Sequence, residues 1–342
     1  MILSLSKKIR KFMQGETRVI SNNPVANMRS RFDSAKVAIK VISCFYFWLF
    51  LDDITHIISL SGKPVALSPP PIGFWMTDMG FTYTSLFIYS IYFFCATACI
   101  IRPDSRWLRV GLFLSVLNSN ILKSSLSTIS YDKNGWIWLA FALIFLPNNK
   151  DKQKCSEKVY QYWYLTTCWF ATALTISVYT MSGMWKILSG FFYDGFVNNY
   201  TFLSSKAMSY HLASHIFRNG YNLPAAEFVI ENHFLGWAML SCAVYLQFFS
   251  FWIPFRPLLF APWLLFLAAF HTLNLVLMNL PFNHQGFIII LLLGGLPFLV
   301  YPKNFYQLIV TMPLAGKIYS GVIDKKEHKA HSYVVRYGFK RP

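Results

Sequence analysis

The run "FTYTSLFIYSIYFFCATACII" (Phe81–Ile101) decides the fold class of this chain, because it carries no Asp, Glu, Lys or Arg. Its length matches the ~20 residues that an α-helix needs to cross the hydrocarbon core of a bilayer. A second uncharged run, Val159–Met181, is of similar length. The whole chain is 55% hydrophobic and 13% charged, whereas soluble domains carry about a quarter charged residues. The sequence therefore predicts an all-α, polytopic membrane protein.

Hydropathy extends this prediction to a bundle of about eight transmembrane helices. The predicted spans are residues 37–60, 81–101, 108–129, 132–148, 160–188, 234–253, 258–280 and 284–301. They define three parts: a basic N-terminal segment (1–36), a transmembrane domain (37–301) and a basic tail (302–342). The longest connection, residues 189–233, contains "FLSSKAMSYHLASHIFRNG", whose helix-like spacing fits either an interfacial helix or an ordinary loop.

Basic residues alternate along the chain in a way that supports this topology. Lys and Arg gather before the first span, at 102–109, at 150–158, at Arg256 and in the tail, whereas the other connections carry few. The positive-inside rule then places both termini in the cytoplasm. The net charge of +17 is explained by topology and by anionic lipid. We expect no nucleic-acid partner, since no nucleic-acid motif accompanies the charge.

Polar and ionisable residues gather in the outer halves of four predicted spans. Ionisable groups inside a bilayer are expensive and mark functional sites by default. The residues of this outer group are Asp52, Asp53 and His56 on the first span, Asn120 and Lys123 on the third, Lys186 on the fifth, and His271 and Asn274 on the seventh. One polar cavity that opens outward would let them satisfy each other; alternatively, each caps a helix or reaches the headgroups separately.

Lys186 ends a long apolar run in "YTMSGMWKILSGFFYDG" (Tyr179–Gly195). It is either an interface anchor or a catalytic base. A desolvated lysine loses much of its preference for the charged form and can then act as a base near neutral pH. His271 lies in mid-helix, where the short imidazole reaches the headgroups poorly, so its position favours the cavity.

The same segments resemble the vitamin K-dependent γ-glutamyl carboxylases and the wider HTTM (horizontally transferred transmembrane) group. The resemblance rests on "YTMSGMWKILSGFFYDG", on "FHTLNLVLMNLPFNHQGF", on "FLDDITHIISLSG" and on "ILKSSLSTISYDKNGWIWLAFALIFLP", and it covers about residues 25–300. It implies that Lys186 is the base that deprotonates a reduced quinone such as vitamin K hydroquinone. It also puts His271 and Asn274 on the positions of the family's Phe-His-x-x-Asn helix.

The sequence differs from the carboxylases in two ways that favour a stand-alone bacterial protein of the HTTM group. The first lysine of the family's pair is Trp185 here, and the chain ends about 40 residues after its last predicted span, without the carboxylases' lumenal domain. The chain is similar in length and short tails to the SdpB-like branch of the HTTM group. That similarity implies a role in the maturation of a secreted peptide toxin, together with a small maturation partner protein.

Three functions are compatible with these features. The first is a membrane enzyme or maturation factor that acts on an exported peptide or a quinone-like lipid, with Lys186 as base. The second is a non-catalytic membrane partner of a secreted peptide: an immunity protein, chaperone or scaffold. The third is a transporter, although the two halves lack the internal similarity typical of that class.

The expected compartment is a bacterial cytoplasmic membrane. The glycosylation acceptor "NYT" at Asn199 leaves an endoplasmic reticulum membrane as the alternative. The six cysteines provide no obvious pair on the oxidising side, so we expect no structural disulfide. No metal ligand set is expected.

Overall fold

The computed structural model describes residues 24–60, 69–126, 133–192, 204–220, 223–280, 283–291 and 312–314. Within these ranges the chain is helical and contains no β-strand, which confirms the all-α prediction. The α-helices are α2 (Pro24–Leu60), α3 (Trp75–Ile101), α4 (Arg106–Ser125), α5 (Asn134–Leu143), α6 (Asn149–Lys154), α7 (Glu157–Phe192), α8 (Ala207–Asn219), α9 (Pro224–Glu231), α10 (His233–Phe249), α11 (Phe260–Met278) and α12 (Asn283–Ile289). Short 3₁₀ helices are η1 (Pro71–Gly73), η2 (Ser250–Phe255) and η3 (Pro257–Leu259).

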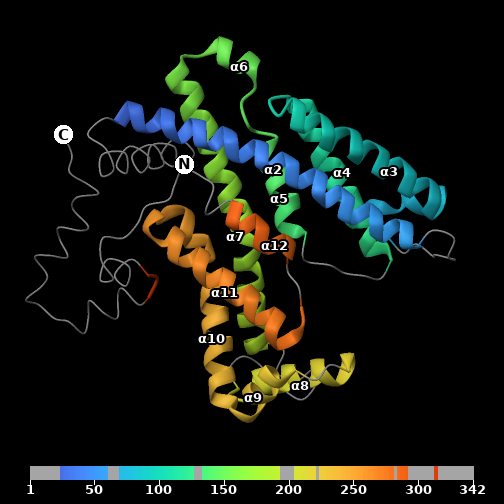
Figure 1. Ribbon diagram of the computed structural model, residues 1–342, viewed down its shortest axis with the longest axis vertical. Helices are drawn as coiled ribbons and strands as arrows, with labels where there is room; N and C mark the ends of the chain where they lie inside the picture. The colour runs from blue at the N-terminus through green and yellow to red at the C-terminus, as the bar shows by residue number, and fades with distance from the viewer. Residues whose placement is uncertain are drawn as a thin grey trace, which may run out of the picture.

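The helices form two groups that cross each other (Figure 1). In one group, α3 packs against both α2 and α4. In the other, α7 and α10 run side by side, and α11 packs against α10. The short helix α5 lies between the groups and contacts both α4 and α7. As a result, the predicted polar residues of α2 and α4 lie in one helix group, and those of α7 and α11 lie in the other.

The core at the crossing is aromatic. On α2, Phe32 packs edge-to-face on Tyr164 of α7, with ring centroids 5.1 Å apart. Further along α2, Tyr46 packs edge-to-face on the fully buried Trp136 of α5, with ring centroids 5.4 Å apart. The Tyr46 hydroxyl donates to the backbone oxygen of Trp136 at 2.8 Å, which satisfies a buried polar atom. These contacts bind α2, α5 and α7 into one core.

A glycine directly precedes the apolar run Phe81–Ile101. Gly80 has a φ of 70°, and this non-helical residue separates the first turn of α3 from the helix that continues to Ile101. Glycine adopts a positive φ without steric cost. The predicted span 81–101 thus begins directly after a real break in the helix.

The helix boundaries differ from the predicted spans mainly by extension. α2 begins at Pro24 and α7 continues from Glu157 to Phe192, so both are longer than the predicted spans 37–60 and 160–188. α5 is shorter, since it covers only ten residues of the predicted span 132–148. The ends of the third and eighth predicted spans (127–129 and 292–301), most of both basic termini, and Asn199 lie outside the described residues.

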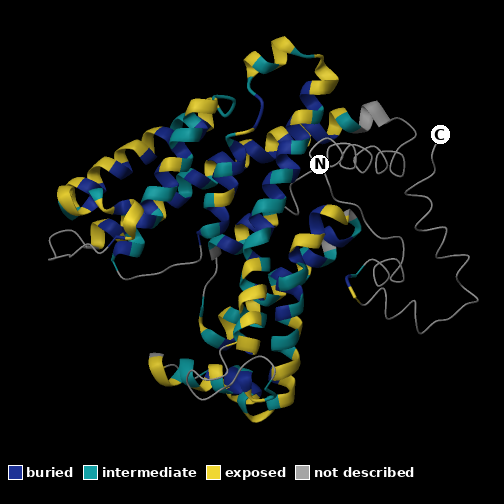
Figure 2. Cartoon of the chain, turned by 180° about the vertical axis from the view of Figure 1, so that it is seen from behind, coloured by how far each residue is buried: buried dark blue, intermediate teal, exposed yellow. Residues whose placement is uncertain are grey.

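Among the described residues, two helical segments are long and apolar enough to cross a membrane: Trp75–Ile101, and His233–Phe255, which joins α10 to η2. Asn134–Leu143 and Pro262–Met278 are shorter apolar helices. Large apolar side chains also remain exposed along α3, where Tyr83 is 70%, Phe94 65% and Ile101 74% exposed (Figure 2). Large exposed apolar surfaces are typical of membrane or protein contacts. These features support membrane association, and the count of eight spans stays a prediction.

Candidate functional site

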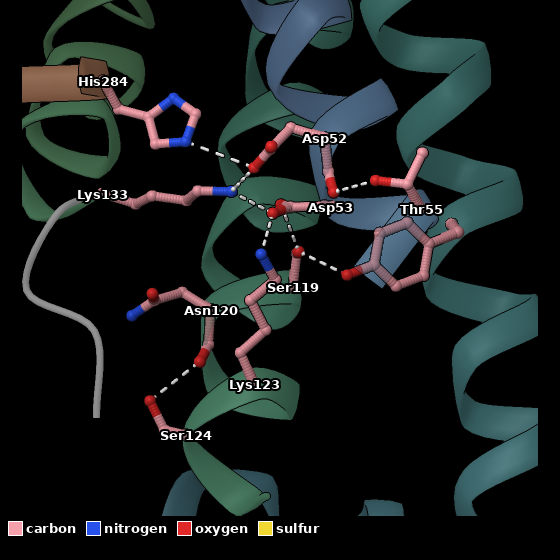
Figure 3. A network of polar contacts seen from close by, with 10 residues as sticks. Asp52, Asp53, Thr55, Ser119, Asn120, Lys123, Ser124, Lys133 and His284 are labelled. Atoms are coloured by element: carbon pink, nitrogen blue, oxygen red, sulfur yellow. Dashed lines mark hydrogen bonds and ion pairs between the residues drawn. The ribbon is translucent and has the colours of Figure 1, made fainter. Parts of the chain in front are cut away.

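Asp53 of α2 is the centre of a buried polar network (Figure 3). The residue is 3% exposed. Its carboxylate accepts a hydrogen bond from Ser119 Oγ at 2.8 Å and forms ion pairs with the Nζ atoms of Lys123 and Lys133. Ser119 and Lys123 are four residues apart and therefore lie on one face of α4. A buried carboxylate is tolerated here because it is paired and hydrogen-bonded.

Asp52 continues this network towards the solvent. Its carboxylate accepts from Lys133 Nζ at 3.1 Å and contacts His284 Nε2 of α12 at 3.2 Å, while its side chain stays 44% exposed. Adjacent residues on a helix point about 100° apart, so Asp53 reaches the core while Asp52 faces α12. Lys133 bridges the two carboxylates, and its side chain is 8% exposed.

The network also reaches α3 and balances its own charge. Tyr89 of α3 shares a hydrogen bond with Ser119 Oγ at 3.0 Å. Two carboxylates, Asp52 and Asp53, face two ammonium groups, Lys123 and Lys133. We call the residues Asp52, Asp53, Tyr89, Ser119, Lys123, Lys133 and His284 the Asp53 network. It ties together α2, α3, α4, the start of α5, and α12.

Two predicted members of the polar group lie beside this network. Figure 3 shows the amide of Asn120 pointing away from Asp53. The backbone oxygen of Asn120 accepts from Ser124 Oγ at 2.9 Å. His56 is exposed on α2, and its backbone oxygen accepts from Ser59 Oγ at 2.6 Å. The described contacts give His56 and Asn120 local roles in their own helices.

Lys186 of α7 lies in a different setting. Its Nζ donates to Ser182 Oγ and to Gln247 Oε1 of α10, both at 2.9 Å. The side chain is half-buried, and Gln247 is 4% exposed. In the described part of the chain, no carboxylate oxygen lies within 4 Å of Lys186 Nζ. Neutral oxygens therefore hold this lysine, whereas carboxylates hold Lys123 and Lys133.

A glycine allows α10 to come this close to α7. A Cβ atom at Gly183 would lie 2.5 Å from the backbone nitrogen of Phe248 and 2.9 Å from the carbonyl carbon of Gln247. Small residues let helix backbones approach in this way. Thr180 strengthens the same contact, since its Oγ1 accepts from the backbone N–H of Phe251 at 3.0 Å. Gly183 thus brings Gln247 within hydrogen-bonding distance of Lys186.

His271 of α11 reaches the same side of α7 through Tyr179. The Tyr179 hydroxyl and His271 Nε2 are 2.7 Å apart, and the two rings pack edge-to-face at 5.8 Å. Tyr179 and Lys186 are seven residues apart, so they lie on one face of α7, about 10 Å apart along its axis. Asn274 is half-buried one turn beyond His271, and its backbone oxygen accepts from the N–H of Leu280 at 3.3 Å.

The helix α8 contributes a further group near Lys186. Partial burial and the charge of Lys186 both lower the pKa of His211. We call Lys186, Ser182, Gln247, Tyr179 and His271 the Lys186 site; α8 lies beside it.

Five of the eight predicted polar residues therefore divide between two groups. Asp52, Asp53 and Lys123 belong to the Asp53 network, whereas Lys186 and His271 belong to the Lys186 site. The sequence did not predict the partners of these residues in the two groups, which are Lys133, Ser119, Tyr89, His284, Ser182, Tyr179 and Gln247. One signal was available: Lys133, in "YDKNGW", lies at the start of the fourth predicted span (132–148), and an ionisable residue inside a span requires a partner.

In the comparisons with known proteins, no family model, no curated protein and no solved structure matches this sequence.

Proposed function

We propose that this chain is an integral membrane protein with an outward-facing polar site at Lys186. In this proposal it is a membrane enzyme or maturation factor that acts on an exported peptide or a quinone-like lipid. The observation that carries the proposal is the set of partners of Lys186 Nζ, namely the neutral oxygens of Ser182 and Gln247.

The choice of Lys186 as base follows from a comparison of three lysines. A carboxylate stabilises the ammonium form of a nearby lysine, and Asp53 pairs with both Lys123 and Lys133. Ser182 and Gln247 offer only neutral acceptors, which stabilise the ammonium form less. Lys186 is thus the one of these three lysines whose ammonium form no carboxylate holds, which suits a general base.

The surroundings of Lys186 are consistent with a site at the outer membrane interface. Tryptophan is enriched at both membrane–water interfaces. Trp163 and Trp185 are both exposed on α7, and their separation of 22 residues corresponds to about 33 Å of helix. That length is close to the ~30 Å of a hydrocarbon core. With the N-terminal side of α7 in the cytoplasm, Trp185 and Lys186 lie at the outer interface.

His271 and Asn274 complete the proposed site. In this proposal the Tyr179–His271 pair orients the substrate or passes a proton to and from it, since a neutral imidazole both donates and accepts. The resemblance to the γ-glutamyl carboxylases and to SdpB-like HTTM proteins of the bacterial cytoplasmic membrane supports a site formed by Lys186, His271 and Asn274. A reduced quinone and a secreted peptide toxin are the substrates that this resemblance favours.

The test is mass spectrometry of the peptides exported by the native host. It compares the wild type, a deletion strain, Lys186→Ala and Lys186→Arg, with Lys36→Ala as a control at an exposed lysine. We expect one exported peptide to change in mass or processing in the deletion and in both Lys186 variants. Arginine keeps the charge but does not act as a base at neutral pH, so Lys186→Arg separates anchoring from proton transfer.

A non-catalytic partner of a secreted peptide is the second candidate function. The closed, charge-balanced Asp53 network favours it, because such a network joins helices without leaving a reactive group. A peptide change in the deletion strain alone, with normal membrane levels of both Lys186 variants, would support this role and reject Lys186 as base.

A further inference from the structure

The helices α8 and α9 form a small unit with its own core. Leu212 of α8 packs with Ala226 and Val229 of α9 and with Leu277 of α11, and all four side chains are buried. The unit lies across the ends of α7 and α10 (Figure 1). An amphipathic helix that crosses the end of a membrane span has the geometry of an interfacial helix.

Hydrogen bonds fix the direction of α8 within this unit. Ser209 Oγ, near the start of α8, lies 3.2 Å from the backbone oxygen of Ile230 at the end of α9. Met208 packs against Gly236 in the first turn of α10. The beginning of α8 therefore lies at the junction of α9 and α10, and its last turn lies away from that junction.

The free surface of α8 combines an aromatic ring with cations. Phe217 in the last turn is 90% exposed, and Arg218 beside it is exposed as well. Lys206 is exposed at the other end, and no acidic residue occurs within Ala207–Asn219. The carboxylates of the unit, Glu227 and Glu231, lie on α9.

We propose that α8 binds the outer leaflet of the membrane, with Phe217 inserted at the boundary of the acyl chains and Arg218 bound to the phosphate of an anionic phospholipid. Lys206 adds a second contact with the headgroups. The inference rests only on the membrane part of the proposed function, and it does not require Lys186 to be a base.

Two features make lipid the occupant of this surface. The first is continuity: α9 leads through Asn232 directly into His233–Phe255, a segment apolar and long enough to cross a bilayer. Its first turns expose Phe234 (67%) and Trp237 (39%), so apolar surface continues from the span towards α8. The second is charge: an exposed arginine beside an exposed aromatic ring suits an anionic headgroup above acyl chains.

The experiment places a spin label at position 217 of the full chain in lipid nanodiscs. Phe217→Cys is labelled after Cys44, Cys155 and Cys242 are replaced by serine. Collision with oxygen, which concentrates in lipid, is compared with collision with a water-soluble nickel complex. Phe94→Cys on α3 is the control for a lipid-facing position, and Glu227→Cys is the control for a water-facing one.

We expect the label at 217 to collide more with oxygen than with nickel, as at 94, and the label at 227 to show the reverse. Stronger collision with nickel at 217 would overturn the proposal. Shielding from both reagents would also overturn it, in favour of a protein partner on this surface. A label at 94 exposed to nickel would instead reject the membrane part of the proposed function.

The role of Arg218 is tested in the same system with two lipid compositions. In nanodiscs that contain phosphatidylglycerol, the label at 217 should lie deeper than in pure phosphatidylcholine, and Arg218→Ala should remove the difference. A depth that is the same in both lipids with Arg218 intact would reject the headgroup contact. Both Phe217 and Arg218 are exposed, so these replacements leave the packed core of the unit unchanged.

Discussion

The Asp53 network and the Lys186 site use the same residue type for different purposes. In the first, two lysines share a 3%-exposed carboxylate, and helices α2, α3, α4, α5 and α12 meet around it. In the second, one lysine is held by a serine and a glutamine. The two sites therefore differ in the partners of their lysines: a shared carboxylate marks a structural lysine, whereas neutral oxygens leave a candidate base.

The sharpest way to break the Asp53 network is Asp53→Asn. The replacement keeps the shape of the side chain but leaves Lys123 and Lys133 without their shared counter-charge. Removing one partner of a buried ion pair costs about 3–5 kcal/mol. We expect a loss of stability of that size, measured by reversible unfolding in detergent or bicelles.

Asp33→Asn is the matched control, because Asp33 is exposed and its ion pair with Lys36 is long, at 4.0 Å. It should change stability by less than about 0.5 kcal/mol. Equal effects of the two replacements would show that the Asp53 network does not hold the helices together.

Gly183→Ala tests the close contact that builds the Lys186 site. The added Cβ would lie 2.5 Å from the backbone nitrogen of Phe248 in α10. A backbone atom cannot move aside as the end of a flexible side chain can. Overpacking of this kind costs about 1–3 kcal/mol, and it should also separate Gln247 from Lys186. Thermal unfolding of the purified protein measures the cost.

Gly286→Ala serves as the control, since in the described part of the chain a Cβ added there would meet no other helix within 4 Å. We expect it to be neutral or slightly stabilising, because alanine favours a helix more than glycine does. A neutral Gly183→Ala would mean that α7 and α10 do not pack as closely as described.

Tyr179→Phe removes the hydroxyl that meets His271 at 2.7 Å. The expected cost in stability is about 0.5–1.5 kcal/mol, the usual net value of one hydrogen bond. If His271 takes part in the proposed activity, peptide processing should fall in Tyr179→Phe as well. Processing that stays normal would give the pair a purely structural role.

Lys186→Met should have the smallest effect on stability. Ser182 and Gln247 are neutral, so no buried charge is left behind. The buried Gln247 Oε1 loses one donor, and we expect a cost of about 1 kcal/mol. The activity, in contrast, should be lost. Lys133→Met is the matched comparison, and it should cost more because Asp52 and Asp53 lose the lysine that bridges them. A larger loss of stability for Lys186→Met than for Lys133→Met would make Lys186 the structural lysine of the two.

The sequence predicted the helices better than it predicted their contacts. Hydropathy located α3 almost to the residue, since Gly80 breaks the helix directly before the predicted span 81–101. It overestimated α5, because an apolar composition indicates burial but does not separate burial in protein from burial in lipid. Of the eight polar residues that the sequence singled out, Asp52, Asp53, Lys123, Lys186 and His271 have side-chain partners on other helices, and their functional role stays a prediction.

The pairing of these residues was not predictable from spacing. Asp53 meets Lys133 across 80 positions, and Lys186 meets Gln247 across 61. Such contacts depend on how the two helix groups cross, and periodicity along one helix carries no information about that crossing. Lys133 and Gln247 were therefore missed, although each is a buried polar residue that requires a partner.

The short helix α5 has a consequence for the way the chain is made. Its ten residues extend about 15 Å, half of a bilayer, and Trp136, Leu139 and Ala142 are completely covered by protein. Much of that cover comes from α7, which leaves the ribosome later. If the chain spans a membrane as proposed, segment 134–143 should pause at the translocon until α7 arrives and enter the membrane with it. Lys133 would then reach Asp53 only at that step, so the ion pairs would form after the helices have entered the membrane and would not guide their entry.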